Sequence, residues 1–402
     1  MPDVVVIGAR CAGASTAMLL ARKGHEVLLV DRASFPSDTP KGHFIHMHGP
    51  RRLADWGLLE RVLGTGCPPV TTATFDLGDF PLTARELSVD DVPLGLGPRR
   101  SQLDAMLVRA AVEAGAELRD GFAVQDLIEE DGRVAGVVGR PGKGQPLLEQ
   151  RCSIVVGADG RNSAVGQHVG ARYTEFSPGV SCWYFTYWSG VPREGLEIRV
   201  KDGRATFGFP TNDDLFALFV AWPSSELTRV RADIEGEYLA VVDTMPDLAE
   251  RVRAGRREER FYGATQLPNF IRQAHGEGWA LVGDAGVHKD PFMALGCCDA
   301  LRDADLLADA LDEGLSGRLP MKEALEGYEQ RRDELTMPWF EINRSAARLQ
   351  PAPDELALRA ALRDSPEDTR QFYLAREGMV PPETFFAEEN IGRIMSASGA
   401  TA

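Results

Sequence analysis

The segment 3–31 limits the fold of this chain more than any other part of the sequence. The run from Asp3 to Ile7 is almost wholly apolar and ends at Gly8, which is typical of a buried parallel strand. Helix-forming residues follow over 12–23, and a second apolar run spans 26–30. A strand, a helix and a strand within about 30 residues make one βαβ unit. Its right-handed crossover belongs to a parallel sheet covered by helices.

The turn between the first strand and the helix reads Gly8-Ala9-Arg10-Cys11-Ala12-Gly13. Gly8 permits the tight turn, Gly13 lets the helix pack close to the strand, and the free amides at the helix start can bind a pyrophosphate. Asp31 ends the second strand, where its carboxylate can accept a ribose hydroxyl. Arg10 replaces the middle glycine of a dinucleotide fingerprint, so the motif is incomplete and an ordinary βα turn is the alternative. The pattern favours NAD or FAD over NADP, whose 2′-phosphate would meet Asp31.

Composition restricts the classes of partner. The chain has 402 residues, a hydrophobic fraction of 44% and a net charge of −16. It can bury a large core, and its charge disfavours nucleic acid and anionic membranes as partners. No apolar run is long enough to span a bilayer, and we expect no signal peptide. The six cysteines show no CxxC pair or regular spacing, so we expect reduced thiols and a cytoplasmic protein.

The rest of the chain alternates in character. Apolar runs at 153–157 and 279–283 predict further parallel strands, and 122–139 predicts a hairpin that turns at Asp131-Gly132. Helices are expected at 51–63, 101–114, 234–253 and 298–311, and largely helical sequence follows from 320 with breaks at Pro338, Pro351 and Pro381.

Aromatic residues gather in 176–222, which holds 11 of the 31 in the chain. Alternation at Phe207 and Phe209, and again over 215–221, predicts an antiparallel sheet with one aromatic face. Such a face is usually core, but it can also line an apolar pocket. The expected pocket residues are Trp183, Phe185, Phe207 and Phe219.

Two aspartate turns carry a resemblance. Ala158-Asp159-Gly160 follows one predicted strand, and Gly283-Asp284-Ala285 follows a later one. With the Gly8 turn and with Arg100-Ser101-Gln102-Leu103, an Arg-x-x-Leu helix start, they stand in the order of class A FAD-dependent monooxygenases, the relatives of para-hydroxybenzoate hydroxylase. Flavin-dependent halogenases share this scaffold. The resemblance covers about residues 1–315.

The resemblance implies an α/β fold: a doubly wound FAD-binding domain, interrupted by a mainly antiparallel substrate domain and followed by a helical C-terminal region. The FAD-binding domain is expected at 1–70, 98–175 and 257–320, the substrate domain at 71–97 and 176–256, and the helical region at 321–402. A monomer or homodimer is expected.

The chemistry of the motif residues agrees with bound FAD. Asp284 can accept the hydroxyls of a ribityl chain, Arg100 supplies a cation near the pyrophosphate, and a helix starting near Cys297 directs its amides at the anionic reduced flavin. The resemblance assigns Asp159 to the NAD(P)H and pyrophosphate region, although a capping role is the alternative for both aspartates. The expected cofactor-binding residues are Gly8, Arg10, Gly13, Asp31, Arg32, Arg100, Asp159, Gly283, Asp284, Pro291, Gly296, Cys297 and Cys298.

His43, His46 and His48 crowd one loop. Their spacing could suggest a metal site, but spacing on a loop fixes no coordination geometry and no cysteine or carboxylate pattern accompanies it, so no metal is predicted. The resemblance places this loop alongside the flavin, which makes His43 and His46 the catalytic candidates that steer the flavin or a substrate hydroxyl. A structural role is the equally weighted alternative. The adjacent Cys297-Cys298 pair lies at a helix start, where the dipole lowers a thiol pKa.

The function implied is monooxygenation of a small aromatic or polyketide-like molecule, hydroxylated or epoxidised through a flavin hydroperoxide. NAD(P)H serves as a transient reductant and dioxygen as co-substrate. A halogenase is the first alternative, although 183–188 lacks the Trp-x-Trp-x-Ile-Pro pattern of that group, and Lys41 and Lys289 are the only nearby candidates for its relay lysine. A prenyl reductase and a non-catalytic FAD-binding scaffold are weighed below it.

Overall fold

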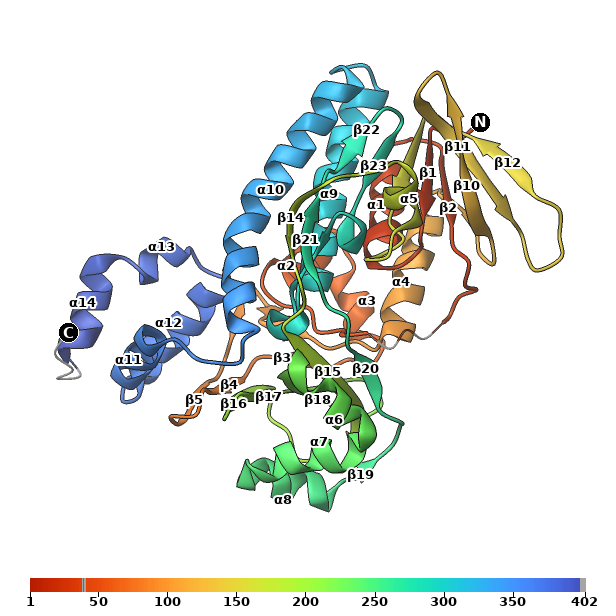
Figure 1. Cartoon of the computed structure of the whole chain (residues 1–402). Helices are drawn as coiled ribbons and strands as arrows, with labels where there is room; N and C mark the ends of the chain where they lie inside the picture. The colour runs from red at the N-terminus through yellow and green to blue at the C-terminus, as the bar shows by residue number, and fades with distance from the viewer. Residues whose placement is uncertain (38, 40, 398–402) are drawn as a thin grey trace.

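The computed structural model describes residues 1–37, 39 and 41–397. One of its two main bodies is built on a six-stranded sheet with the order β22-β23-β13-β1-β2-β9 (Figure 1). The strands are β1 (Val4–Ile7), β2 (Val27–Val30), β9 (Glu117–Arg119), β13 (Ile154–Gly157), β22 (His275–Gly276) and β23 (Trp279–Leu281). All neighbours are parallel except β22, which runs antiparallel to β23. The predicted βαβ unit is confirmed, with α1 (Cys11–Arg22) as its crossover.

Successive residues of β1 enter different cores because side chains alternate across a sheet. Val4 and Val6 pack in the core that holds α1, α4 (Arg100–Glu113) and α9 (Leu295–Leu315). Val5 and Ile7 pack in a second core on the opposite face. That face is covered by β10 (Ala123–Glu130), β11 (Arg133–Arg140), β12 (Leu148–Arg151) and the short helix α5 (Ala164–His168). The predicted α/β class is confirmed, with the second layer made mainly of this three-stranded sheet.

An eight-stranded sheet forms a second body below the first (Figure 1). Its strands are β4 (Ala73–Asp76), β5 (Pro81–Ala84), β15 (Ser181–Ser189), β16 (Leu196–Lys201), β17 (Arg204–Pro210), β18 (Phe216–Pro223), β19 (Arg256–Arg257) and β20 (Tyr262–Ala264). All pairs are antiparallel except β16 with β4. The expected antiparallel sheet is therefore present, and the residue boundaries of the domains remain a proposal.

The aromatic segment alternates along its strands as the sequence predicts, but it places aromatic side chains on both faces of the sheet where one aromatic face was expected. Trp183, Phe185 and Tyr187 enter the core shared with the C-terminal helices. Tyr184 and Trp188 enter a separate core against the helices α6 (Leu227–Ala232), α7 (Ile234–Asp243) and α8 (Pro246–Ala254). Both faces of β15 are therefore buried, which explains why large apolar residues occupy both of them.

Several expected helix ends are wrong. The helix expected at 51–63 is two helices, α2 (His48–Asp55) and α3 (Leu59–Leu63), because Gly57 takes a φ of 72° between them. The helix α10 (Met321–Ala346) runs through Pro338, where a break was expected. Proline removes one backbone hydrogen bond, but Pro338 is exposed, so water can reach the freed carbonyl while buried Thr336 and Phe340 anchor the helix.

The C-terminal helices pack beside β4 and β5 (Figure 1). They are α11 (Pro353–Leu362), α12 (Pro366–Arg376), α13 (Pro382–Phe385) and α14 (Glu388–Ala397). Arg359, only 1% exposed, donates to the Phe75 carbonyl at 3.0 Å and to Asp79 at 2.9 Å. The Tyr373 hydroxyl donates to the Leu82 carbonyl at 2.7 Å. These buried hydrogen bonds fix the C-terminal helices to the sheet. Residues 398–402 of the expected helical region lie outside the described residues.

Across the described ranges, no helix combines the length and the apolar character that crossing a membrane requires.

Candidate active site

The glycine turn after β1 is sterically closed to side chains at two positions. Gly8 has a φ of 102°, and a Cβ there would lie 2.5 Å from the Ala158 carbonyl oxygen. A Cβ on Gly13 would lie 1.7 Å from the Gly8 carbonyl oxygen. The first turn of α1 therefore sits against the backbone of the loop, which is the close approach that a pyrophosphate-binding turn needs.

Asp31 closes this turn from the end of β2. Its Oδ2 accepts the Ala9 N–H at 2.8 Å, and its Oδ1 accepts the Ala33 N–H at 2.8 Å. Each carboxylate oxygen keeps a further lone pair, so the group can still accept a ribose hydroxyl. Arg32 follows it and is exposed.

The buried carboxylate of Asp104, which was not predicted as a site residue, binds both Arg10 and Arg100. Asp104 accepts from Arg10 Nη1 at 2.7 Å and from Arg100 Nε at 3.1 Å and Nη2 at 2.9 Å. Asp104 therefore fixes the direction of the Arg10 guanidinium. The signal was present in the sequence, since Arg100 and Asp104 stand four residues apart on one helix, the spacing of a side-chain ion pair.

The two aspartate turns differ in their contacts. Asp159 Oδ2 accepts the amides of Ala164 at 2.7 Å and Val165 at 3.2 Å, at the start of α5. Asp284 is 30% exposed, and Lys41 Nζ lies 3.6 Å from its Oδ2. Asp159 thus makes the helix-capping contacts of its alternative role, whereas the carboxylate of Asp284 is partly exposed.

The segment 290–298 brings the start of α9 close to Asp284. Ala294 takes a φ of 52° before the helix, and Gly296 is exposed in its first turn, with Asp284 Oδ1 3.9 Å from the position of a Cβ. Pro291 opens a short 3-10 turn whose Asp290 cap accepts the Phe292 N–H at 3.0 Å. The amides of α9 and the Asp284 carboxylate therefore face one region.

The two cysteines at this helix start are buried in different surroundings. A hydrogen bond with the Cys11 thiol lowers the pKa of Cys297. Burial raises the pKa of Cys298, whose sulfur accepts the His46 N–H at 3.4 Å. All six cysteines are free thiols.

The three loop histidines point to different partners, and their pKa values shift in different directions. The His43 Nδ1–H donates to the Gly97 carbonyl at 3.2 Å, its Nε2 accepts the Tyr187 hydroxyl at 3.0 Å, and burial lowers its pKa to about 3. Burial also lowers the pKa of His48 to about 4. Burial lowers the pKa of His46 as well, but the Glu377 carboxylate outweighs it and the net shift is upward. His43 is therefore neutral, whereas the Glu377 carboxylate favours the protonated form of His46.

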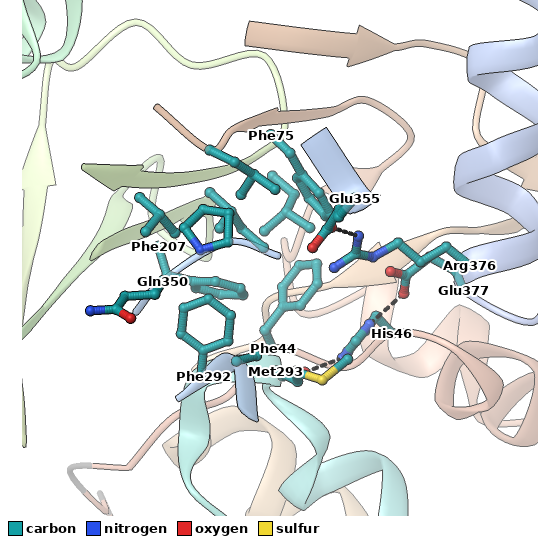
Figure 2. Close-up of a pocket in the computed structure, with 16 residues that line it drawn as sticks. Phe44, His46, Phe75, Phe207, Phe292, Met293, Gln350, Glu355, Arg376 and Glu377 are labelled. Carbon is teal, nitrogen blue, oxygen red and sulfur yellow. Dashed lines mark hydrogen bonds and ion pairs between the residues drawn. The ribbon is translucent and has the colours of Figure 1, made fainter. Parts of the chain in front are cut away.

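A cavity of about 70 Å³ lies between the eight-stranded sheet and the C-terminal helices (Figure 2). It is lined by Phe44, His46, Phe75, Leu77, Leu196, Ile198, Val200, Phe207, Phe292, Met293, Ala346, Gln350, Pro351, Glu355, Arg376 and Glu377. Its walls are mostly apolar. Figure 2 shows two polar pairs at one side: Arg376 donates to Glu355 at 2.7 Å, and His46 to Glu377 at 2.5 Å.

The four expected pocket aromatics are brought together, but not all reach this cavity. Phe207 lines it, and Trp183 packs near it with its ring 6.3 Å from that of Phe292. Phe185 and Phe219 stack on each other at 4.3 Å, and Phe219 also packs against His43. The polar lining residues from α11 and α12 were missed, since that part of the sequence shows only helical periodicity.

The residues present fit FAD. The Gly8–Gly13 turn leaves the space that a Cβ would fill, Asp31 keeps acceptor capacity, and Asp284 and Gly296 expose an acceptor and the first amides of a helix to one region. We propose that the Gly8–Gly13 turn and Asp31 hold the adenosine and pyrophosphate portion of FAD. Asp284 and the helix start at Gly296 would hold its ribityl chain and flavin.

Relatives of this chain act on varied substrates. A 1H-pyrrole-2-carbonyl-[peptidyl-carrier protein] brominase of Pseudoalteromonas luteoviolacea (strain 2ta16) is 25% identical over 330 residues, 78% of each chain. Digeranylgeranylglycerophospholipid reductase 2 of Methanothermobacter thermautotrophicus is 28% identical over 344 residues, 82% of each.

Solved structures share the fold. The flavin-dependent brominase Bmp2 superposes with a TM-score of 0.82 at 20% identity and covers 98% of both chains. PqsL of Pseudomonas aeruginosa, solved with 2-aminobenzoylacetate, gives 0.72 at 24% identity, covering 92% of this chain and 98% of its own.

The strongest comparison is with a family. The FAD binding domain model matches residues 1–338, which include the glycine turn, both aspartate turns and the whole eight-stranded sheet. The chain therefore belongs to the FAD binding domain family, with the fold shared by class A flavin-dependent monooxygenases and halogenases, and it is a flavin-dependent oxidoreductase.

Proposed function

We propose that the chain is an FAD-dependent monooxygenase of a small aromatic or polyketide-like molecule. The observation that carries this proposal is the aromatic cavity beside the start of α9. Phe292 and Met293, which are separated from that helix only by its N-cap Ala294, also line the cavity. A molecule bound there would lie next to the segment proposed to hold the flavin.

FAD would supply the redox chemistry: it accepts a hydride from NAD(P)H and activates dioxygen. The overall reaction balances as substrate, dioxygen, NAD(P)H and a proton giving oxygenated substrate, NAD(P)⁺ and water. The chain's own residues bind, orient and exclude water. Phe44, Phe207 and Phe292 offer ring faces and edges to a planar substrate. Their apolar wall keeps bulk water from the reacting region.

A halogenase is the second candidate, favoured by the likeness to a brominase. The two lysines suggested by the sequence are held elsewhere. Lys289 pairs with Asp299 at 2.7 Å and is 3% exposed, and Lys41 lies 3.6 Å from Asp284. The polar groups that do reach the cavity are Gln350 and the two ion pairs. We therefore place oxygenation first.

The deciding experiment measures NAD(P)H oxidation by the purified yellow protein with a panel of aromatic metabolites, with and without bromide or chloride. A monooxygenase gives a product heavier by one oxygen, independent of halide. A halide-dependent product carrying one halogen would replace the proposal with halogenation. A product heavier by two hydrogens, formed without dioxygen uptake, would indicate a reductase.

A further inference from the structure

His46 is the meeting point of three separate parts of the chain. Its backbone N–H donates to the Cys298 sulfur in α9 at 3.4 Å. Its ring contacts Glu377 at the end of α12 at 2.5 Å and the Met293 carbonyl at 2.8 Å. Figure 2 shows the ring lying between these two partners. One side chain thus joins the loop before α2, the start of α9 and the C-terminal helices.

The charge of His46 follows from its partners. Nδ1 faces a carboxylate and Nε2 faces a carbonyl oxygen, and both of these groups only accept hydrogen bonds. Both ring nitrogens must therefore carry a proton. Neither proton is free for a substrate while these bonds persist, so the geometry gives His46 a role in holding its neighbours.

Those neighbours adopt costly backbone conformations. Met47 has a φ of 51° and Ala294 a φ of 52°. Non-glycine residues rarely adopt such angles, and they persist only where the surroundings impose them. Each one directly follows a residue of the His46 cluster: Met47 follows His46, and Ala294 follows Met293. Ala294 also sets the direction in which α9 begins.

Glu377 occupies an unfavourable place for a carboxylate. It is 5% exposed and caps the C-terminus of α12, the negative end of a helix. It accepts from the His46 ring and from the Met47 N–H. A single anion from the C-terminal helices therefore pins both the charged ring and one of the two strained residues. It also lies beyond the 1–338 segment that the family model matches.

We propose that Glu377 is a positioning residue: through His46 it fixes Met47 and the Met293–Ala294 turn, so that the C-terminal helices set the orientation of the α9 start toward the flavin. The proposal rests on the flavin placement given above. It also makes α12, which supplies Arg376 and adjoins Glu377 in the cavity wall, part of the machinery that aligns cavity and cofactor.

The test measures FAD affinity of the apoprotein by fluorescence titration. Glu377→Gln keeps the side-chain shape and removes the charge, and we expect FAD binding to weaken by about tenfold, the lower range for loss of a charge-assisted hydrogen bond. The matched control is Glu355→Gln, which removes a carboxylate from the same cavity wall but one paired with Arg376. It should change FAD affinity by less than about twofold.

A double-mutant cycle separates positioning from general loss of structure. His46→Gln alone, Glu377→Gln alone and the pair together should weaken FAD binding to similar extents, because each breaks the same link. The pH profile gives an independent reading. The groups acting on His46 are Glu377 and Asp299, with Arg376 beside Glu377. Wild-type affinity should fall as pH rises through the raised pKa of His46, and in Glu377→Gln this fall should move to lower pH.

The proposal is overturned if Glu377→Gln binds FAD as the wild type does, or if its effect simply adds to that of His46→Gln. Asp284→Ala tests the flavin placement separately. If Asp284→Ala retains FAD, the placement is wrong. If Asp284→Ala loses FAD while Glu377→Gln has no effect, the placement holds and the positioning role of Glu377 fails.

Discussion

Replacing Gly13 by alanine tests the assignment of the first turn of α1. The new Cβ would lie 1.7 Å from the Gly8 carbonyl oxygen and 3.0 Å from the Ala158 Cβ. The first obstacle is backbone, so the helix start has to move. Overpacking of this kind costs about 1–3 kcal/mol, offset by about 1 kcal/mol from the better helix propensity of alanine. The displaced amides should weaken FAD binding by about tenfold or more, since each amide–phosphate bond is charge-assisted.

The matched control is Gly327→Ala. Gly327 lies inside α10, and no atom outside its own helix lies within 4 Å of a Cβ there. The same substitution should therefore raise stability by up to about 1 kcal/mol and leave FAD binding unchanged. The assays are urea unfolding of the apoprotein and FAD titration of both variants. A Gly13→Ala protein with wild-type stability and wild-type FAD affinity would refute the reasoning.

Three further predictions concern single side chains. Asp31→Asn places an amide NH₂ where a carboxylate oxygen accepts a backbone N–H, so FAD affinity should fall by about 1–3 kcal/mol; unchanged titrations would mean that the ribose is held elsewhere. Burial raises the pKa of Asp290 to about 6, above an unfolded value of about 3.9. The folded state therefore binds more protons, and the stability of the wild type should fall as the pH rises from about 4 to about 6. Urea unfolding of Asp290→Asn should lack this fall, and parallel stability–pH curves for the two proteins would contradict the prediction. Phe207→Ala opens the cavity wall, whereas Trp222→Ala opens the core on the other face of the sheet. Both should lose about 3–5 kcal/mol of stability, but only the first should divert NAD(P)H consumption to hydrogen peroxide; equal peroxide yields would remove Phe207 from the substrate site.

The local elements of the cofactor half could be predicted from the sequence. Residue spacing correctly predicts the first βαβ unit, which consists of β1, the glycine turn, α1 and the strand that precedes Asp31. The aromatic strand β15 also forms where it was expected, although it buries aromatic residues on both faces instead of one. These features depend on periodicity and on turn stereochemistry, which act between residues close in the chain. Where a local rule failed, as at Pro338, tertiary anchoring of the helix outweighed the missing hydrogen bond.

The polar contacts of the candidate site required the tertiary structure. Asp104 accepts a hydrogen bond from Arg10, which is 94 residues away in the sequence, and His46 contacts Glu377, which is 331 residues away. Neither pair leaves a periodic mark in the sequence, because the partners become neighbours only when whole sheets and helices pack. The charges of His43 and His46 illustrate the same point. The two residues share one loop and one ordinary pKa, yet burial among aromatic rings keeps the first neutral, while a carboxylate from the far end of the chain raises the pKa of the second.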